Sequence, residues 1–554
     1  MSKEKIVNGE TSLGIEFGST RIKAVLTDYS GAVLAIGTYD WENSLVDNIW
    51  TYSEEEILAG LKGCYASLVS AVDSKYGVKI TKIGAMGISA MMHGYLAFDK
   101  DGKLLAPFQT WRNSNTGKAA DELTELFDFN IPLRWTISHL YQRILDGEKH
   151  VKDIAFVTTL DSFIHCLLTG EKITGIGDAS GIFPIDSKTC DYDQTMVDKF
   201  DKLLDDKGYR KSLGFNWKLR DILPKVLVAG EKAGQLTEAG AALLDESGNL
   251  QAGAVFCPSE GDAGTGMVAT NSVAPKTGNI SAGTSTFAMI VLEKQLSKLH
   301  REIDMVTTPD GYPVAMSHAN NGTSDLNSWV GLFAEFANLL MAKYSNEDIE
   351  ELEKLDGAEA QSRVDIGDIY EILYKNSLKG DLDAGGLLSY GYLSGEGITG
   401  FNEGRPLFAR RPDGNMNLAN FMKSHLYTSL GAVKMGLDII LKEEGMACES
   451  INGHGGFFKT EGVGQRYLAA AVNAPVTVMA NAGEGGPWGM ALLGIYMLEK
   501  DNYASLSEFL EKKVFKDVAK TTVCPDAKEV EGFERFMDSY KKGLAIEKAA
   551  IESL

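Results

Sequence analysis

The sequence predicts an α/β fold in which two similar domains face each other across a cleft. The first observation behind this prediction is LGIEFGSTRIKAVLTD at 13–28, where apolar alternation on both sides of a Gly-Ser-Thr turn predicts a strand, a turn and a second strand. The second is TGNISAGTSTFAMIVLEK at 277–294, which repeats this pattern much later in the chain. The interval is too long for a solenoid repeat and is typical of a duplicated domain.

The elements of the first domain follow one another in a recognisable order. The stretch 24–41 continues the opening sheet through a Tyr-Ser-Gly turn. Ser53 is expected to cap a helix over 53–72, because acids fill its first turn and apolar residues recur at helical spacing. KITKIGAMGIS at 79–89 predicts a buried strand that ends at the loop SAMMHG. Antiparallel strands followed by alternating helices and parallel strands indicate an α/β domain of the nucleotide-binding kind.

The boundary between the two domains is expected near residues 268–275, after the Gly-rich stretch VFCPSEGDAGTGMVAT. This boundary gives an N-terminal domain at 1–270 and a C-terminal domain at 271–500. Residues 501–554 are rich in Lys, Glu and Asp at helical spacing and are expected to form a solvated helical tail.

Composition narrows the class of protein. Hydrophobic residues make up 44% of the 554 residues and charged residues 23%, as in soluble globular proteins. The net charge of −22 argues against binding of nucleic acid, which needs a basic face, but backbone donors and a metal ion can still hold ATP. The start MSKEKIVNGE lacks a signal-peptide core and no apolar run is long enough to cross a bilayer, so a cytoplasmic protein without a membrane partner is expected.

The cysteines also favour a cytoplasmic location. They are scattered without a CxxC pair, so reduced thiols are expected and a zinc or iron–sulfur site is not. The six positions are Cys64, Cys166, Cys190, Cys257, Cys448 and Cys524.

Three Gly-rich turns have the composition of phosphate-binding loops. Glycine lets a ligand approach the backbone, and Ser and Thr add hydroxyl donors beside exposed N–H groups. The first turn alone is equally compatible with an ordinary hairpin. A third Gly-rich element, INGHGGFFKT at 451–460, follows a helix predicted over 426–445 and precedes another over 462–473. Three such turns at strand ends favour a nucleotide site, whose residues we expect to be Gly18, Ser19, Thr20, Lys23, Gly283, Thr284, Ser285, Gly455, Gly456, Phe457 and Lys459.

Asp262 is the candidate general base. It lies in SEGDAGTG, the loop between the two halves of the chain. Phosphoryl transfer to an alcohol needs a base close to the attacking hydroxyl and little other covalent chemistry from the protein. Taken alone, Asp262 is better explained as a turn residue that caps the following helix. Together with the three phosphate-type turns it favours the catalytic interpretation.

The ordered set of motifs resembles the FGGY family of carbohydrate kinases over residues 12–497. The resemblance implies two RNase H-like domains of the actin/hexokinase ATPase type around a deep cleft, with ATP and Mg²⁺ and a sugar or polyol as ligands, and a homodimer as the assembly. It rests on seven motifs, which are GIEFGSTRIKAVL, GISAMMHG, DASGIFPID, SEGDAGTG, SAGTST, GLLSYGYLSGE and GHGGFFK.

The resemblance also implies site residues. MMHG looks most like the Met-His-Gly of the xylulokinases in this family, whose two side chains touch the sugar, so Met92 and His93 are implied to bind substrate. QTWRN places Trp111 and Asn113 where the family lines the sugar pocket. Asp262 corresponds to the general base and contacts substrate, and with Glu16 it is expected to organise the metal. Asp178 is implied to be structural or to line the cleft.

Two departures from the family pattern concern the same site. Glu16 stands where the family has Asp, and its extra methylene moves the carboxylate by about 1.5 Å. Glu16 would then reach the metal directly or through fewer waters, or would mark a subgroup with altered activity. His139, in RWTISHLYQ, stands near a position where a lysine is common, which puts the sugar rather than the reaction in doubt.

The leading hypothesis is an ATP-dependent kinase for a small ketose or polyol, with a xylulose-type pentulose first. Ribulose, gluconate, glycerol and other polyols stay open as substrates. A non-kinase ATPase of the same superfold is the alternative class, although an activator of a radical dehydratase would need clustered cysteines and a chaperone a separate peptide-binding domain. A sugar-sensing repressor would need a DNA-binding motif before Leu13, where only a dozen residues stand.

Overall fold

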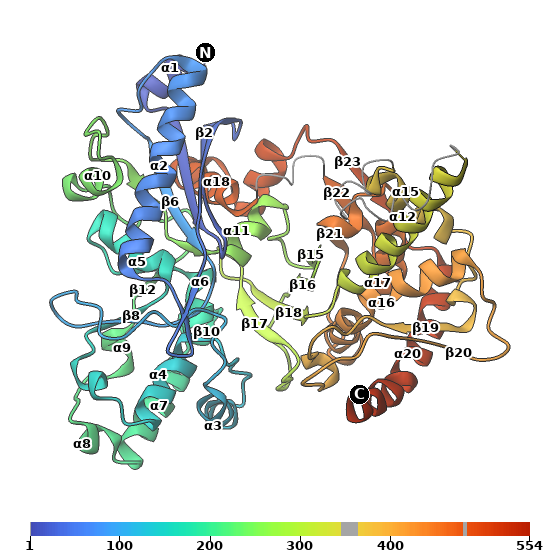
Figure 1. Ribbon diagram of the computed structural model, residues 1–554. Helices are drawn as coiled ribbons and strands as arrows, with labels where there is room; N and C mark the ends of the chain where they lie inside the picture. The colour runs from blue at the N-terminus through green and yellow to red at the C-terminus, as the bar shows by residue number, and fades with distance from the viewer. Residues whose placement is uncertain (1, 345–363, 480–484) are drawn as a thin grey trace. The chain divides into compact units, whose positions relative to one another are not determined.

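The computed structural model describes the chain except residues 1, 345–363 and 480–484, and contacts divide it into two units (Figure 1). The first unit comprises Met1–Pro275, Val291–Ala315 and Ala480–Ala519. The second comprises Lys276–Ile290, Met316–Met479 and Lys520–Leu554. This grouping differs from the expected division at residues 270 and 500, because late segments of the chain pack onto elements formed much earlier.

The main sheet of the first unit begins as predicted. Strands β1 (Thr11–Phe17), β2 (Arg21–Asp28) and β3 (Val33–Asp40) are antiparallel neighbours. Strand β6 (Ala85–Ala90) then runs parallel to β1, and β13 (Val255–Phe256) runs parallel to β6. The order β13-β6-β1-β2-β3 confirms the predicted change from antiparallel to parallel pairing.

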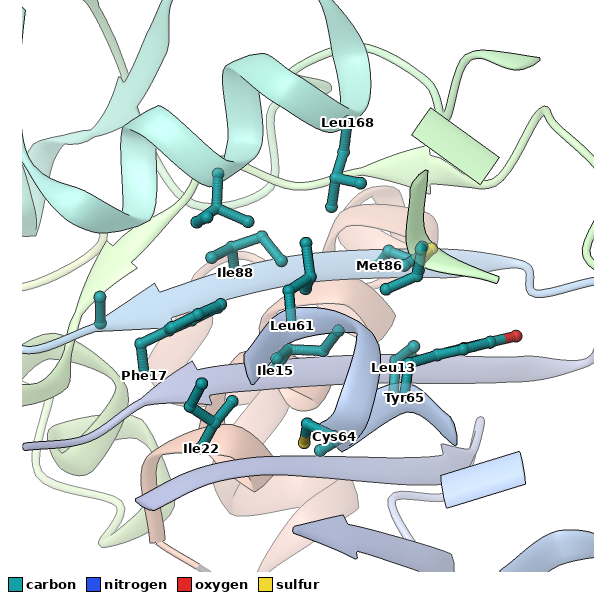
Figure 2. Close-up of a cluster of buried hydrophobic side chains, with 14 of the residues drawn as sticks. Leu13, Ile15, Phe17, Ile22, Leu61, Cys64, Tyr65, Met86, Ile88 and Leu168 are labelled. Carbon is teal, nitrogen blue, oxygen red and sulfur yellow. The ribbon is translucent and has the colours of Figure 1, made fainter. Parts of the chain in front are cut away.

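One face of this sheet is apolar and is covered by α2 (Glu54–Tyr76). The Ser53 hydroxyl accepts a hydrogen bond from Glu56 N at 3.1 Å, and the Glu56 carboxylate accepts one from Ser53 N at 2.7 Å, which confirms the predicted cap. Alternate residues of β1 point into this core, where Figure 2 shows them beside side chains of α2 and β6. The labelled members are Leu13, Ile15, Phe17, Ile22, Leu61, Cys64, Tyr65, Met86, Ile88 and Leu168.

The other face of β1 carries Ser12, Gly14 and Glu16 and packs on α18 (Gly485–Glu499). Ser12 Oγ donates to the carbonyl of Ala491 at 2.7 Å. A Cβ atom at Gly14 would lie 2.0 Å from the Pro487 carbonyl oxygen, so only glycine allows the helix to approach this closely. The period-two alternation of a strand therefore places Glu16 on the helix-facing side of the sheet.

The second unit has its own sheet and repeats the opening hairpin. β15 and β16 are antiparallel and β15 and β21 are parallel, which confirms the second predicted hairpin and the strand before the third Gly-rich loop. The strands lie in the order β18-β16-β15-β21-β22-β23. Their bounds are β15 Thr277–Ala282, β16 Thr286–Val291, β18 Pro313–Ala319, β21 Ser450–His454, β22 Val476–Met479 and β23 Lys520–Val523.

The expectation of a solvated helical tail is wrong. Helix α20 (Ala527–Ser553) buries Phe533, Phe536, Met537 and Tyr540 within the second unit. The Tyr540 hydroxyl lies 2.7 Å from that of Tyr392, and the Tyr540 carbonyl accepts a hydrogen bond from Tyr390 at 2.5 Å. The other long helices of this unit are α12 Ser324–Tyr344, α15 Ile366–Ser377, α16 Leu418–Asp438 and α17 Val463–Val472.

The remaining elements complete the two units. The strands are β4 Ser44–Val46, β5 Ile49–Thr51, β7 Leu96–Phe98, β8 Phe156–Thr158, β9 Ile173–Gly175, β10 Ile185–Asp186, β11 Asp191–Tyr192, β12 Lys225–Leu227, β14 Glu260–Gly261, β17 Asp304–Thr307, β19 Leu387–Tyr390 and β20 Leu407–Arg410. The helices are α1 Ser2–Asn8, α3 Gly117–Phe127, α4 Thr136–Leu145, α5 Leu160–Thr169, α6 Ile176–Ile182, α7 Gln194–Asp206, α8 Tyr209–Leu213, α9 Leu219–Ile222, α10 Glu238–Leu244, α11 Asp262–Ala269 and α19 Leu506–Phe509. Among the described residues, no helix has the length and apolar character needed to cross a bilayer.

Candidate functional site

The turn between β1 and β2 presents backbone donors because its carbonyl groups are held by aromatic side chains. Trp41 Nε1 donates to the Gly18 carbonyl at 2.8 Å, and the Tyr52 hydroxyl donates to the Ser19 carbonyl at 2.6 Å. The rings of Trp41 and Tyr52 stack with their centroids 4.0 Å apart. No described residue accepts a hydrogen bond from the N–H groups of Ser19 or Thr20. The turn therefore offers an anion two successive N–H donors and two side-chain hydroxyls.

Glu16 lies at the centre of the polar face of the first sheet. It is the cross-strand neighbour of Lys23 in β2 and of Ser89 in β6. Burial, and next the negative charge of Asp262, raise the pKa of Glu16 to about 8, whereas Lys23 and the Ser89 hydroxyl lower it. A Cβ atom at Gly486 would lie 1.6 Å from Glu16 Oε2, so α18 confines the carboxylate tightly.

Asp262 is the first residue of α11, and one of its carboxylate oxygens is fixed by the backbone. Asp262 Oδ1 accepts hydrogen bonds from Met92 N at 3.2 Å and Ala263 N at 3.0 Å. No described residue donates to Oδ2. The Asp262 side chain is open to solvent. Desolvation by the surrounding protein nevertheless raises its pKa, although the backbone hydrogen bonds act in the opposite direction. An oriented, accessible carboxylate of this kind suits proton removal from a bound hydroxyl.

Glu16 and Asp262 form a pair of neighbouring carboxylates that fits a divalent cation. The charge of Asp262 disfavours the ionised form of Glu16, and a bound cation would relieve this repulsion. Among the described residues no third His, Cys, Asp or Glu joins them in a metal-binding group. This donor set suits Mg²⁺, which keeps several waters and is commonly bound by one or two carboxylates together with substrate phosphates.

Met92 lies directly beside Asp262, and His93 follows it in the same loop. A Cβ atom at Gly261 would lie 2.1 Å from Met92 Cγ, and one at Gly181 would lie 2.6 Å from His93 Nδ1. His93 is 6% exposed and adopts a positive φ of 72°. Burial, and then the charge of Arg134, lower the pKa of His93 well below its usual value, so the ring is neutral. Because Nδ1 faces Gly181, Nε2 is the ring nitrogen left for a ligand.

The two residues expected from QTWRN have different environments. Trp111 is 41% exposed, and its Nε1 donates to Ser19 Oγ at 3.1 Å, so it lies at the first phosphate-type turn. Asn113 is buried, and its amide is fully used by Trp50 and Thr110. Its Oδ1 accepts from Trp50 N at 2.9 Å, and its Nδ2 donates to the Trp50 carbonyl at 2.8 Å. Asn113 therefore anchors the chain around Trp50.

Glu260 is a buried acid of this site that the sequence reasoning did not single out. Its carboxylate accepts hydrogen bonds from Gly177 N at 3.2 Å and Asp178 N at 3.1 Å, at the start of α6. Burial raises the pKa of Glu260 to about 8. Asp178 is also buried and accepts a hydrogen bond from the Thr159 hydroxyl at 2.6 Å, which gives it a structural place behind Met92 and His93.

His139 does not line the candidate site. Its ring is fully buried beside Tyr95, with ring centroids 6.4 Å apart, and neither ring nitrogen has a hydrogen-bond partner among the described residues. Burial, and then the charge of Arg143, lower the pKa of His139 to about 3.

The second turn, Gly283 to Ser285, lies in the second unit. As in the first turn, its carbonyl groups accept hydrogen bonds, but here the donors are backbone N–H groups. Its carbonyl groups are occupied: Gly322 N donates to Thr284 O at 2.8 Å, and Thr323 N donates to Gly283 O at 2.8 Å. The N–H groups of Thr284 and Ser285 donate to no described residue. Both turns therefore present N–H groups at the end of a β-hairpin.

The third Gly-rich loop lies against the second turn. Gly455 has a positive φ of 99°, and a Cβ atom there would lie 2.5 Å from the Ala282 carbonyl, so glycine is required. Gly456 and Lys459 are exposed. The Phe457 side chain is fully buried and contacts the ring of Phe458 at 5.4 Å between centroids, so it supports the loop from the core.

A cavity of about 780 Å³ in the second unit brings these predicted residues together. Gly283, Thr284, Gly456 and Lys459 line it. Thr460 and Glu461 continue the third Gly-rich loop. The rest of the wall was not predicted, because its residues come from the segment after β18, from α12 and from α15 and the residue before it, whose sequences carry no glycine-rich signal. These residues are Thr323, Asn327, Asp365, Ile366, Gly367, Tyr370, Glu371, Tyr374 and Lys375.

Known proteins resemble this chain in sequence and in fold. Residues 11–248 match the N-terminal domain model of the FGGY family of carbohydrate kinases, and residues 278–498 match its C-terminal domain model. A glycerol kinase of Thermococcus kodakarensis is 25% identical over 203 residues, which cover 34% of this chain and 40% of that protein. A xylulose kinase of Klebsiella pneumoniae is 24% identical over 298 residues, which cover 52% of this chain and 55% of that protein.

The matched region thus spans about half the length of these curated relatives. Among solved structures, gluconate kinase from Lactobacillus acidophilus superposes with a TM-score of 0.72 at 15% identity, over 97% of this chain and 98% of that chain. Likeness at this level shows a shared fold and confirms the predicted fold class.

Proposed function

Because the chain belongs to the FGGY family of carbohydrate kinases, we propose that it transfers the γ-phosphoryl group of ATP to a hydroxyl of a small ketose or polyol. The observation that carries this proposal is Asp262, which has one oxygen held by Met92 N and Ala263 N and the other left accessible. Met92 and His93 beside it provide an apolar contact and a neutral imidazole for a sugar. We assign Met92, His93 and Asp262 to substrate binding.

A xylulose-type pentulose is the first candidate substrate. It rests on the Met92-His93 pair, which resembles that of xylulokinases. Ribulose, gluconate, glycerol and other polyols are the alternatives, since the named relatives include kinases for glycerol, xylulose and gluconate. Trp111 and Asn113 stay proposed residues of the acceptor pocket. The Asn113 amide is hydrogen-bonded to Trp50, so it would act by positioning the chain around Trp50.

The proposed reaction needs one proton acceptor. The free Asp262 Oδ2 takes the hydroxyl proton of the sugar as the hydroxyl oxygen forms a bond to the γ-phosphorus. The bond between that phosphorus and the bridging oxygen breaks, and ADP leaves with the electron pair. Helix α11 holds Asp262 through Ala263 N, and the 91–94 loop holds it through Met92 N, so the base is oriented before substrate binds.

The nucleotide is assigned to the cavity of the second unit. Its volume of about 780 Å³ lies within the usual range for small-molecule pockets. The N–H groups of Thr284 and Ser285 and the side chain of Lys459 would bind phosphate oxygens. The first turn, with Gly18, Ser19, Thr20 and the nearby Lys23, is proposed as a phosphate-binding element of the first unit.

Glu16 and Asp262 would hold Mg²⁺. The cation would supply charge neutralisation for the phosphates. Gly486 and Ser89 hold the Glu16 carboxylate near Asp262, where both side chains could contact the same cation. A cytoplasmic location, expected from the sequence composition, and a homodimer, implied by the family resemblance, belong to the same proposal.

The test replaces Asp262 by Asn. Asp262→Asn keeps the shape and the backbone hydrogen bonds but lacks the base, so kcat should fall by at least about 10²-fold while ATP still binds. Asp193→Asn is the matched control, because Asp193 also accepts a backbone hydrogen bond at a helix start, from Met196 N at 3.0 Å. It should leave kcat unchanged.

A sugar panel separates the kinase from a non-kinase ATPase of the same fold. A coupled assay of ADP release with pentuloses, hexuloses, polyols and aldonates should show strong stimulation by at least one acceptor. ADP release that no acceptor changes would support the ATPase alternative. Near wild-type turnover of Asp262→Asn would remove Asp262 from the base role.

A further inference from the structure

The residue after His93 is hydrogen-bonded to residues at the start of α4, and this places Arg134 beside the 91–94 loop. Gly94 N donates to the Arg134 carbonyl at 3.1 Å, and the Thr136 hydroxyl donates to the Gly94 carbonyl at 2.6 Å. The Arg134 charge reaches the His93 ring, where it adds to the effect of burial on the pKa of that ring. Arg134 and His93 are therefore neighbours in one rigid corner of the first unit.

The Arg134 guanidinium is already paired with a carboxylate. Its Nη2 forms an ion pair with Asp304 Oδ2. The other oxygen of Asp304 accepts a hydrogen bond from Asn130 Nδ2 at 3.0 Å. The side chains of Arg134 and Asp304 are 27% and 15% exposed, so the pair is largely withdrawn from water but still accessible at its edge.

Asp304 is held in place by the same helix that supports His93. Asp304 begins β17, and at the other end of this strand Thr307 N donates to Ser180 Oγ at 3.1 Å. The Thr307 hydroxyl donates to the Ile176 carbonyl at 2.8 Å. Ser180 and Ile176 belong to α6, which also carries Gly181 against His93. The positions of Asp304 and His93 are thus coupled through α6.

We propose that the Arg134–Asp304 pair makes this site selective for neutral ketoses and polyols over sugar acids. This inference rests on the proposed kinase function and names the class of its acceptor. A hydroxyl can donate to Asp304 or accept from Arg134 at the edge of the pair without separating the two charges. A substrate carboxylate would be repelled by Asp304 and would have to compete with it for the guanidinium.

The cost of that competition is what creates selectivity. Separating a partly buried ion pair leaves one charge without its partner, and this is strongly unfavourable. Asp304 thus acts as the repulsive element that specificity usually needs in addition to attractive contacts. A preference for sugar acids is the alternative outcome, and one of the solved structures that share this fold is a gluconate kinase.

The first experiment uses the wild-type protein. It compares kcat/KM for neutral ketoses and polyols with kcat/KM for aldonates of the same chain length, with ATP and Mg²⁺ saturating. We expect the best neutral acceptor to exceed the best aldonate by at least about 10²-fold, the size of effect given by an unpaired partly buried charge. The aldonates should also inhibit the neutral reaction only weakly.

The second experiment changes the pair. Asp304→Asn removes the repulsion and frees Arg134 while Asn130 can still contact the new amide, so the ratio of aldonate to neutral kcat/KM should rise at least about tenfold. Asp121→Asn is the matched control, because Asp121 pairs with Arg301 at 2.7 Å on the exposed surface. It should leave the ratio unchanged.

The outcomes separate the two proposals. A wild-type protein that phosphorylates aldonates as well as or better than neutral acceptors overturns the selectivity inference and leaves the kinase proposal intact. A protein that phosphorylates no acceptor in the panel overturns the kinase proposal itself. Should Asp304→Asn fail to fold, the wild-type ratio and the aldonate inhibition constants still decide the question. If a folded Asp304→Asn protein keeps the wild-type ratio of aldonate to neutral kcat/KM, the Arg134–Asp304 pair does not determine the selectivity.

Discussion

Glu16 shows at the scale of single residues how a longer side chain can be accommodated in a site. The family pattern has the shorter Asp at this position. Here Gly486 on α18 leaves room for the additional methylene, because a Cβ atom would lie 1.6 Å from Glu16 Oε2. The carboxylate therefore stays close enough to Asp262 for the two to interact, which favours the proposal that Glu16 serves the metal over the one in which it marks a subgroup with altered activity.

Gly486→Ala should displace the Glu16 carboxylate and lower kcat by about 10²-fold, the usual effect of moving a catalytic group by about 1 Å. Nucleotide affinity should change little, because the cavity lies in the second unit. Gly266→Ala in α11 is the control, since a Cβ atom there meets no atom within 4 Å. Steady-state kinetics and nucleotide titration provide the measurement. Wild-type kcat in Gly486→Ala would show that the Glu16 position is not critical.

At the scale of elements, the strands and turns of both hairpins follow directly from the sequence. Apolar runs on both sides of Gly18-Thr20 and Gly283-Ser285 predict the two hairpins correctly, because strands buried on nearly every position and interrupted by a Gly-rich turn leave a strong local signal. The capping of α2 by Ser53 is equally local. Asp262 at the start of α11 could also be predicted, since a carboxylate after a strand and before a helix is visible in the sequence.

Other elements could not be predicted, because their environment depends on distant parts of the chain. Nothing local distinguishes α20 from a solvated helix, yet four of its apolar side chains are covered by the second unit. Asn113 looks like any polar pocket residue until Trp50 is found against its amide. Tyr370 and Tyr374 line the cavity although α15 has no motif for nucleotide binding.

Tyr540→Ala in α20 should lower the free energy of unfolding of the second unit by about 3–5 kcal/mol, because it removes a fully buried aromatic ring. Tyr540→Phe keeps the ring and loses the hydroxyl contact with Tyr392, so a loss of about 1 kcal/mol is expected. Native-state hydrogen exchange of α16 and α20 in urea measures both. Exposed Lys542→Ala is the control, and equal values for the three variants would contradict the packing of α20.

At the scale of the whole molecule, the candidate sugar residues and the candidate nucleotide cavity belong to different units. We therefore expect ligand-specific protection in hydrogen exchange. A non-hydrolysable ATP analogue alone should slow exchange at Thr284–Ser285 and Gly456–Lys459. A neutral acceptor alone should slow exchange at Met92–Gly94. Analogue-induced protection confined to the first unit would contradict the assignment of the nucleotide to the second.

The packing of α18 against Ser12, Gly14 and Glu16 also has a consequence for how the protein is made. A nascent chain leaves the ribosome from its N-terminus, and domains usually fold in that order. Here the side of the first sheet that carries Ser12, Gly14 and Glu16 stays uncovered until the stretch around Trp488 has been synthesised, long after β1, β2 and β3. The opening hairpin therefore lacks one of its packing layers during the synthesis of the several hundred residues that separate it from α18.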